Sequence, residues 1–341
     1  MKRIGQLFGT LVVVLGFLGA VTAWWAMRPL TLANQTVDIS IEPQTTVRGI
    51  AQVVADAGVD VEPVLLYGFF RLSGQSRKLR AGSYEISEGE SLLDLLRKLS
   101  RGEESLKAVG LIDGWTFKQF RAALAKAPNL NHDSQGLSDA ELMARLGKPG
   151  VPPEGHFFPD TYTYGKGASE LRVMERALHA MDKQLAAAWA QRDTSIILKS
   201  PDEALILASI VEKETGKESD RGMISSVFHN RLRINMPLQT DPTVIYGMGD
   251  AFDGNLRRAD LLSDHPWNTY TRKGLPPTPI AMPGRNALRA TMHPDSSKAL
   301  YFVARGDGSS VFSETLEAHN AAVNRYQRGG ASQPSNGAQA K

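Results

Sequence analysis

The chain has 341 residues, more than one hydrophobic core usually supports, so two or three domains are expected. It contains no cysteine, which excludes disulfides, thiolate metal ligands, cysteine nucleophiles and a lipidated N-terminal cysteine. The formal net charge is +3, and Lys2 and Arg3 supply two of these charges. The remaining chain is close to neutral, so nucleic acid is not expected as a partner.

An uncharged, largely apolar run from Ile4 to Met27 follows the two basic residues. At about 1.5 Å per residue, a helix of this length crosses a hydrocarbon core of roughly 30 Å. Basic residues before the run favour a cytoplasmic stub at residues 1–3, a transmembrane helix at 4–27 and a body on the far side. The alternative is a signal peptide cleaved after residues 21–23, although the run exceeds the roughly 7–15 apolar residues typical of one.

Residues 36–102 have the pattern of a small module. Alternating apolar and polar residues predict strands, and Ser91 is a good N-cap before a leucine-rich helix. The predicted order is a strand around Ile39, a helix after Thr46, a helix after Pro63, a strand over residues 80–86 and a helix after Ser91.

The larger part of the chain, residues 107–327, is predicted to be mixed α+β, with a long helix beginning at Ser169. Residues 152–162 are rich in proline, glycine and aromatic residues, which suits a rigid connection or a groove wall, with core packing as the alternative. Residues 306–308 are predicted to form a hairpin turn. The polar tail at residues 328–341 is predicted to be disordered.

Residues 202–215 are predicted to form a buried helix, because the segment is apolar on nearly every side. Glu214 follows Val211 by three residues and Leu207 by seven, so it continues the most apolar stripe. Burial and the negative end of the helix dipole both disfavour an anion, so the pKa of Glu214 is expected to be raised. A carboxyl protonated near neutral pH is what glycosidic bond cleavage requires of its acid.

A structural role for Glu214 is the alternative. Its carboxylate could pair with one of three nearby cations, Lys217, Arg221 or Arg231. The neighbouring acids Glu212 and Glu218 are predicted to be solvated charges at helix ends.

Several motifs together resemble the YceG-like family of endolytic murein transglycosylases. They are Ala208-Ser209-Ile210-Val211-Glu212-Lys213-Glu214-Thr215, Ser226-Val227-Phe228-His229-Asn230-Arg231-Leu232, Leu238-Gln239-Thr240-Asp241-Pro242-Thr243-Val244-Ile245-Tyr246-Gly247, Asn268-Thr269-Tyr270 and Gly274-Leu275-Pro276-Pro277. The resemblance covers nearly the whole chain. It implies that residues 36–102 are a LysM-like peptidoglycan-binding module and that residues 107–327 are the transglycosylase catalytic domain.

The resemblance also implies a reaction and a catalytic residue. The second glutamate of the family's Glu-Lys-Glu-Thr run falls on Glu214. Such an enzyme protonates the bond between N-acetylmuramic acid and N-acetylglucosamine, and the muramyl 6-hydroxyl then closes on C1 to leave a 1,6-anhydro end. Cleavage within nascent strands would limit their length. His229 and His156 depart from the residues common in the family, which puts only the groove lining in doubt.

Five polar residues are predicted to contact the substrate in the groove. They are Gln239, Thr240, Asp241, Asn268 and Tyr270. Their side chains can hydrogen-bond sugar hydroxyls and acetamido groups, and Asn268 and Tyr270 could instead orient the acid. The alternative is ordinary turn chemistry, because Asp-Pro and Asn-Thr pairs are also good local caps.

No cofactor or metal is expected, because the seven histidines lack metal-ligand spacing. The expected partners are glycan strands of peptidoglycan and the membrane, and the resemblance adds peptidoglycan synthases. The expected location is the bacterial inner membrane, with the catalytic body in the periplasm. The alternative function is a membrane-tethered scaffold that binds peptidoglycan without cutting it.

Overall fold

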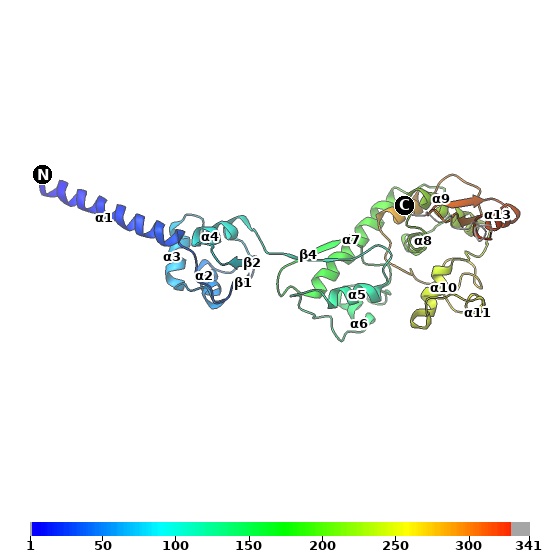
Figure 1. The fold of residues 1–341 in the computed structure, drawn as a ribbon, viewed down its shortest axis with the longest axis horizontal. Coiled ribbons are helices and arrows are strands. Elements are labelled where there is room, and N and C mark those ends of the chain that lie inside the picture. The colour runs from blue at the N-terminus through cyan, green and yellow to red at the C-terminus, as the bar shows by residue number, and fades with distance from the viewer. Residues whose placement is uncertain (1, 329–341) are drawn as a thin grey trace, which may run out of the picture. The chain divides into compact units, whose positions relative to one another are not determined.

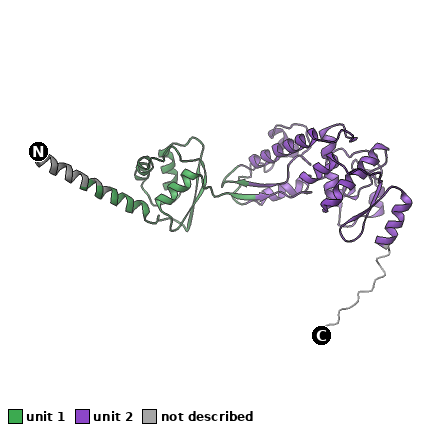
Figure 2. Ribbon diagram, turned by 90° about the horizontal axis from the view of Figure 1, so that it is seen from above, with its two compact units in different colours: residues 1–108, 128–131, 163–168 green, residues 109–127, 132–162, 169–341 purple. Residues whose placement is uncertain are grey.

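The computed structural model describes residues 2–328, so the predicted disordered tail lies, apart from its first residue, outside the described residues. The chain divides into two compact units (Figure 2). Unit 1 comprises residues 1–108, 128–131 and 163–168, and unit 2 comprises residues 109–127, 132–162 and 169–341.

The chain begins with helix α1, Lys2–Met27. Across the described part of the chain, no helix combines the length and the apolarity that a membrane crossing requires. The side chains of residues 1–12, 15 and 18 are outside the described part. The transmembrane helix over residues 4–27 therefore stays a prediction.

Unit 1 has the predicted order of a strand, two helices, a strand and a helix (Figure 1). The elements are β1 (Thr36–Ile41), α2 (Val47–Asp56), α3 (Pro63–Leu72), β2 (Gly82–Ser87) and α4 (Leu92–Arg101). Strands β1 and β2 pair antiparallel, with Ile39 opposite Tyr84. Alternate side chains of β1, including Val37, Ile39 and Ile41, are buried in the core of the unit.

Helix α4 shows how local sequence sets an element of this unit. Ser91 caps the helix and exchanges hydrogen bonds with Asp94 in a capping box, as its sequence position predicts. Gly102 ends the helix in the left-handed region, with φ of 71°. Four leucines on one face, at positions 92, 95, 96 and 99, are buried in the core of the unit.

Two short segments join unit 1 from later in the chain, at residues 128–131 and 163–168, which the predicted boundaries place in the catalytic domain. The Asn131 N–H donates to the carbonyl of Ala168 at 2.9 Å. Lys166 forms an ion pair with Asp38 of β1 at 2.7 Å. These contacts join the two segments to each other and to β1.

Unit 2 holds most of the helices (Figure 1). The helices are α5 (Phe117–Ala125), α6 (Asp139–Arg145), α7 (Glu170–Ala190), α8 (Pro201–Glu214), α9 (Glu218–Arg233), α10 (Asp241–Met248), the short η1 (Gly249–Ala251), α11 (Arg258–Leu262), α12 (Arg285–Met292), α13 (Leu316–Val323) and η2 (Asn324–Arg328). Strands β3 (Lys107–Gly110) and β4 (Thr161–Tyr164), which the sequence did not predict, form one two-stranded sheet. Strands β5 (Tyr301–Ala304) and β6 (Ser310–Ser313) form the predicted hairpin.

Helix α8 is the centre of the unit 2 core. The Ser200 hydroxyl accepts the Glu203 N–H at 3.1 Å, and Pro201 occupies the first turn, where its missing N–H costs nothing. Residues 204–211 are buried except for Ile206. Helices α7, α9 and α12 all pack against α8. This packing confirms the predicted buried helix and fixes the position of its C-terminal end.

The aromatic residues of the 152–162 segment belong to the core, as the alternative reading held. Phe157 is fully buried and stacks on Phe117 with ring centroids 5.3 Å apart. Tyr162 is also buried, and its hydroxyl donates to the carbonyl of Phe158 at 2.8 Å.

Candidate active site

Glu214 is the last residue of α8, and its half-buried side chain faces the start of α10. The Thr240 hydroxyl, just before α10, donates a hydrogen bond to Oε1 of Glu214. Within the described residues, Oε2 has no hydrogen-bond partner. One carboxyl oxygen is therefore held in place and the other is left for chemistry.

Burial raises the pKa of Glu214 from 4.5 to about 7. The hydrogen bond from Thr240 and the charge of Arg231 act in the opposite direction, while the carboxylate of Asp241 adds to the increase. A large share of the Glu214 side chains is thus protonated at neutral pH, as the helix position led us to expect.

The backbone of Thr240 is fixed by two other threonines. The Thr240 N–H donates to Oγ1 of Thr269 at 3.1 Å, and the Thr243 hydroxyl donates to the Thr240 carbonyl at 2.7 Å. The Thr243 and Thr269 hydroxyls lie 2.9 Å apart. All three side chains are buried. The donor that contacts Glu214 therefore has little freedom to turn away.

Gln239 and Asp241 flank Thr240 and have exposed side chains. Gln239 has φ of 49°, a left-handed conformation that is uncommon outside glycine and that clusters at functional sites. The Tyr270 hydroxyl donates to Oδ1 of Asp241 at 2.5 Å. Burial, followed by this hydrogen bond, raises the pKa of Tyr270, so its hydroxyl stays protonated. Three of the five predicted substrate contacts, Thr240, Asp241 and Tyr270, thus lie near the carboxyl of Glu214, and Gln239 directly precedes Thr240 in the chain.

Asn268, the fifth predicted contact, is fully buried. Its amide nitrogen donates to backbone carbonyls, at 2.7 Å from Ser263 and 3.1 Å from Leu261. Its amide oxygen accepts the N–H of Tyr270 at 2.8 Å. The side chain thus caps the loop that carries Thr269 and Tyr270, which is the turn chemistry that the sequence also allowed.

Within the described residues, none of the three candidate cations forms an ion pair with Glu214. Arg231 is buried and donates to backbone carbonyls, at 2.7 Å from both Leu300 and Leu238. Arg221 pairs instead with Glu212. The alternative role of Glu214, as the ion-pair partner of one of these cations, is therefore not found among the described residues.

The prediction that Glu212 is a solvated charge is wrong. Its side chain is 5% exposed and pairs with Arg221 of α9 at 3.1 Å. Its second oxygen accepts the N–H of Gly284, the N-cap of α12, at 3.0 Å. Helical spacing could not reveal these partners, because α9 and α12 approach from other parts of the chain. Glu218, by contrast, is exposed at the start of α9, as predicted.

Glu154 is a second buried carboxyl, to which the sequence assigned no role. Its side chain accepts the Phe117 N–H at 3.0 Å. Burial raises its pKa from 4.5 to about 7. In the sequence, the one sign of this buried carboxyl was an acidic residue within a segment rich in proline and aromatic residues.

The two histidines that depart from the family pattern lie in different surroundings. His229 is fully buried, and its Nε2 lies 3.0 Å from the carbonyl of Thr291, so it belongs to the core. His156 lines a hollow of about 410 Å³ beside Pro277 and Asp202. Over residues 2–328 there is no group of three or more acidic or histidine side chains that could hold a metal ion.

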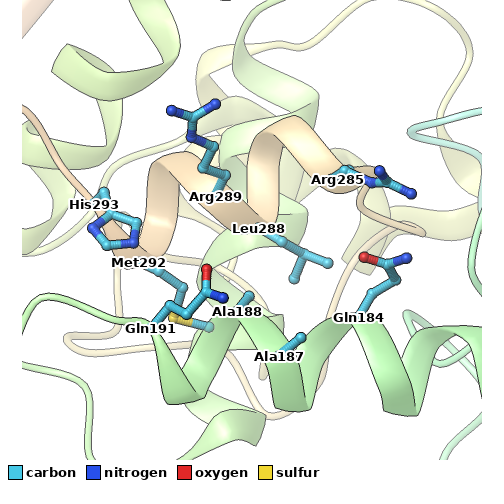
Figure 3. A pocket seen from close by; sticks show the side chains of 9 residues that line it. All are labelled: Gln184, Ala187, Ala188, Gln191, Arg285, Leu288, Arg289, Met292 and His293. Atoms are coloured by element: carbon cyan, nitrogen blue, oxygen red, sulfur yellow. The ribbon is translucent and has the colours of Figure 1, made fainter.

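A separate hollow of about 200 Å³ lies between α7 and α12 (Figure 3). Arg285 and Arg289 of α12 line it together with His293, which directly follows that helix. Gln184 of α7 and Gln191, which directly follows α7, line the other side. None of the residues that contact Glu214 lines this hollow. We therefore locate the candidate active site at the junction of α8, α10 and the 268–270 loop.

The chain is similar to known proteins along most of its length. The model of the YceG-like family matches residues 39–325. An endolytic murein transglycosylase of Bacillus subtilis (strain 168) is 33% identical over 314 residues, which cover 86% of each chain. One of Streptococcus pneumoniae is 27% identical and covers 84% of this chain and 58% of the relative.

A crystal structure of a YceG-like protein from Listeria monocytogenes aligns with a TM-score of 0.55 at 29% identity. It covers 85% of this chain and 99% of the Listeria chain. The family match, the curated relatives and the shared fold agree with the motifs around Glu214. This chain belongs to the YceG-like family.

Proposed function

We propose that this protein is an endolytic lytic transglycosylase that cleaves the glycan strands of peptidoglycan, with Glu214 as its catalytic acid. The observation that carries the proposal is the carboxyl of Glu214, which has a pKa of about 7, no ion-pair partner among the described residues and one oxygen free of hydrogen bonds. The activity named for the Bacillus subtilis and Streptococcus pneumoniae relatives supports it.

The geometry suits a single carboxyl that acts twice. Protonated Glu214 delivers its proton from Oε2 to the oxygen of the bond between N-acetylmuramic acid and N-acetylglucosamine, while Thr240 holds Oε1. The ionised carboxylate then takes the proton of the muramyl 6-hydroxyl as that oxygen closes on C1. Because the nucleophile belongs to the substrate, no second carboxylate is needed to activate water. The product carries a 1,6-anhydro end.

The exposed residues next to the acid are the proposed substrate contacts. Gln239 and Asp241 offer an amide and a carboxylate to sugar hydroxyls and acetamido groups, and Tyr270 fixes the Asp241 carboxylate. Thr240 is proposed to orient the acid. Asn268 is proposed to position the loop without contacting the sugar, because its amide is occupied by the backbone.

We also propose the surroundings in which the enzyme works. Strands β1 and β2 pair antiparallel, and helices α2 and α3 lie between them in the chain. This order supports a LysM-like peptidoglycan-binding role for residues 36–102. The catalytic domain follows at residues 107–327. The uncharged run over residues 4–27 supports a single membrane anchor, with the catalytic body in the periplasm. Peptidoglycan synthases are the proposed protein partners, and cleavage of nascent strands would limit strand length.

The test is a digest of isolated peptidoglycan by the full chain, with products resolved by mass, for the wild type and Glu214→Gln in parallel. Anhydro-ended fragments from the wild type alone are expected. Reducing ends, heavier by one water, would mean that the enzyme uses water as the nucleophile. Binding without any cleavage would support the non-catalytic scaffold instead.

A further inference from the structure

Helix α3 of unit 1 is apolar on the face that points away from the core. Leu66 and Phe70 form its buried face and belong to the core of the unit. Val64, Leu65 and Leu72 lie away from that core and are 68%, 58% and 86% exposed. A helix that is apolar on every side is normally covered on every side, and exposed apolar patches mark interaction sites. The outer face of α3 therefore calls for a partner.

The outer face of α3 lies beside the end of the uncharged N-terminal run. Trp25 of α1 packs edge-on against Phe69 of α3, with ring centroids 6.0 Å apart (Figure 1). Ala26 is 2% exposed and belongs to the core of unit 1, so the last turn of α1 is fixed to this unit. Trp24 and Met27 of the same turn are 64% and 66% exposed. The end of α1 and the outer face of α3 thus present neighbouring exposed apolar side chains.

Basic side chains accompany this apolar surface. Arg28 directly follows α1, and its guanidinium lies 5.2 Å from the ring centroid of Trp24. Arg71 in the last turn of α3, and Arg77 and Lys78 in the turn after it, are exposed. Among the described residues, none of these four cations has an ion-pair partner. Tryptophan at the end of an apolar helix is typical of the membrane interface, and clustered cations attract anionic headgroups.

We propose that the outer face of α3 and the last turn of α1 dock on the surface of the lipid bilayer and hold unit 1 against it. Such surfaces bury their apolar side chains roughly 5–10 Å deep, at the boundary of headgroups and acyl chains. The cations around the patch then meet lipid phosphates, which an apolar helix of a partner protein does not offer. The inference rests on the membrane anchor of the proposed function, because α1 brings unit 1 to the bilayer.

The test uses the full chain in vesicles of phosphatidylcholine and phosphatidylglycerol, with a fluorescent label on one introduced cysteine. The chain contains no cysteine, so each label marks a single position. Lipids that carry a quencher at headgroup depth or at mid-bilayer depth report where the label lies, and iodide reports its exposure to water. A label on Val64→Cys is expected to be quenched several-fold more by the headgroup-depth lipid than by the mid-bilayer lipid, and to be shielded from iodide.

Glu42→Cys is the matched control within the same unit. The loop at residues 88–90 bonds both to Leu30, shortly after α1, and to Gln35, just before β1. Glu42 follows the other end of β1 and is exposed. Its label is expected to remain open to iodide and to escape both lipid quenchers.

Two double variants, each with the label at position 64, test the patch itself. Leu65→Asp/Leu72→Asp should lower the quenching at headgroup depth to the level of the control, with an unchanged fold because both side chains are exposed. Thermal unfolding checks the fold. Arg77→Gln/Lys78→Gln should weaken the quenching in these vesicles but not in vesicles of phosphatidylcholine alone. Quenching that survives either double variant in full would overturn the docking.

A label on Val14→Cys, within the uncharged run, reports the anchor separately. Quenching of this label at mid-bilayer depth, together with an iodide-accessible label at position 64, would overturn the docking and leave the anchor intact. No lipid quenching at either position would overturn the anchor. A label at position 64 that is shielded from iodide but not quenched by lipid would assign the face to a second copy of the chain. Glycan cleavage is not the readout, so the proposed catalytic activity stands or falls separately.

Discussion

Glu212 and Glu214 lie two residues apart at the end of α8, and their carboxyl groups enter different surroundings. Glu212 pairs with Arg221 and accepts the N–H of Gly284, so both of its oxygens are occupied by the protein. Glu214 accepts one hydrogen bond from Thr240, and no described cation pairs with it. Burial raises the pKa of both carboxyls.

The comparison shows that a raised pKa does not by itself identify the acid. Structural ion pairs also perturb pKa values, so the partners must be considered. Glu212 joins the end of α8 to α9 and α12, whereas Glu214 retains an oxygen that can give and take a proton. The same helix end therefore contains an anchor, Glu212, and the proposed acid, Glu214, and each can be tested against the other.

Replacing the acid should have the largest effect. Glu214→Gln removes the proton donor and is expected to lower the rate of anhydro-end formation by roughly 10²–10⁴-fold, the usual contribution of a general acid. The measurement is the mass-resolved digest at neutral pH. Circular dichroism should show an unchanged fold, because glutamine can still accept the Thr240 hydroxyl. If Glu214→Gln cleaved peptidoglycan at the wild-type rate, Glu214 would not be the catalytic acid, and its distinction from Glu212 would be lost.

Replacing the anchor should act mainly on stability. Glu212→Gln leaves Arg221, whose side chain is 12% exposed, without its counter-charge, and the free energy of unfolding is expected to fall by about 3 kcal/mol. Denaturant unfolding measures this loss. The exposed Glu218→Gln is the matched control and should change stability by less than about 0.5 kcal/mol. If Glu212→Gln kept full stability but lost all cleavage, Glu212 would have to be assigned to the chemistry.

The pH dependence of stability distinguishes the acid from its surroundings. The folded pKa of Glu214, about 7, lies above the ordinary 4.5, so the folded state binds more protons between these values. The stability that Glu214 contributes is therefore complete below pH 4.5 and is lost as the pH rises through 7. The free energy of unfolding of Glu214→Gln minus that of the wild type should therefore rise by about 2 kcal/mol from pH 5 to pH 8.

Thermal or denaturant unfolding at the two pH values measures that difference. Subtracting the wild-type stability from that of Glu214→Gln at each pH cancels the opposing contribution of His229, because both proteins contain it. Burial lowers the pKa of His229 to about 4. A stability difference that stays constant with pH would mean that Glu214 is ionised throughout the range.

The smallest expected effect comes from the residue that holds the acid. Thr240→Val removes the hydroxyl that contacts Glu214 and should reduce kcat by roughly tenfold, while Thr240→Ser should retain most of it. Because the hydrogen bond from Thr240 lowers the pKa of Glu214, its loss should also move the alkaline limb of the pH profile upward. If the alkaline limb of the Thr240→Val pH profile matched that of the wild type, the hydrogen bond from Thr240 to Glu214 would be contradicted.

Local pattern was enough to predict the strands and helices of residues 36–102 and the buried helix that ends at Glu214. The alternation in β1, the capping box of α4 and the apolar periodicity of α8 involve residues within a few positions of one another, so sequence spacing reports them directly. The same spacing favoured Glu214 over Glu212 as a desolvated carboxyl. Strands β3 and β4 escaped prediction because each has only four residues and lies far from its partner in the chain.

The amino-acid sequence by itself determined which carboxyl ends the most apolar stripe of a buried helix, because helical geometry is local. Only the tertiary structure decided what each carboxyl meets there. Thr240 reaches Glu214 across 26 positions, Gly284 reaches Glu212 across 72, and Phe117 reaches Glu154 across 37. Such partners depend on how α5, α9, α10 and α12 pack, and packing is set by burial of the whole core rather than by neighbours along the chain.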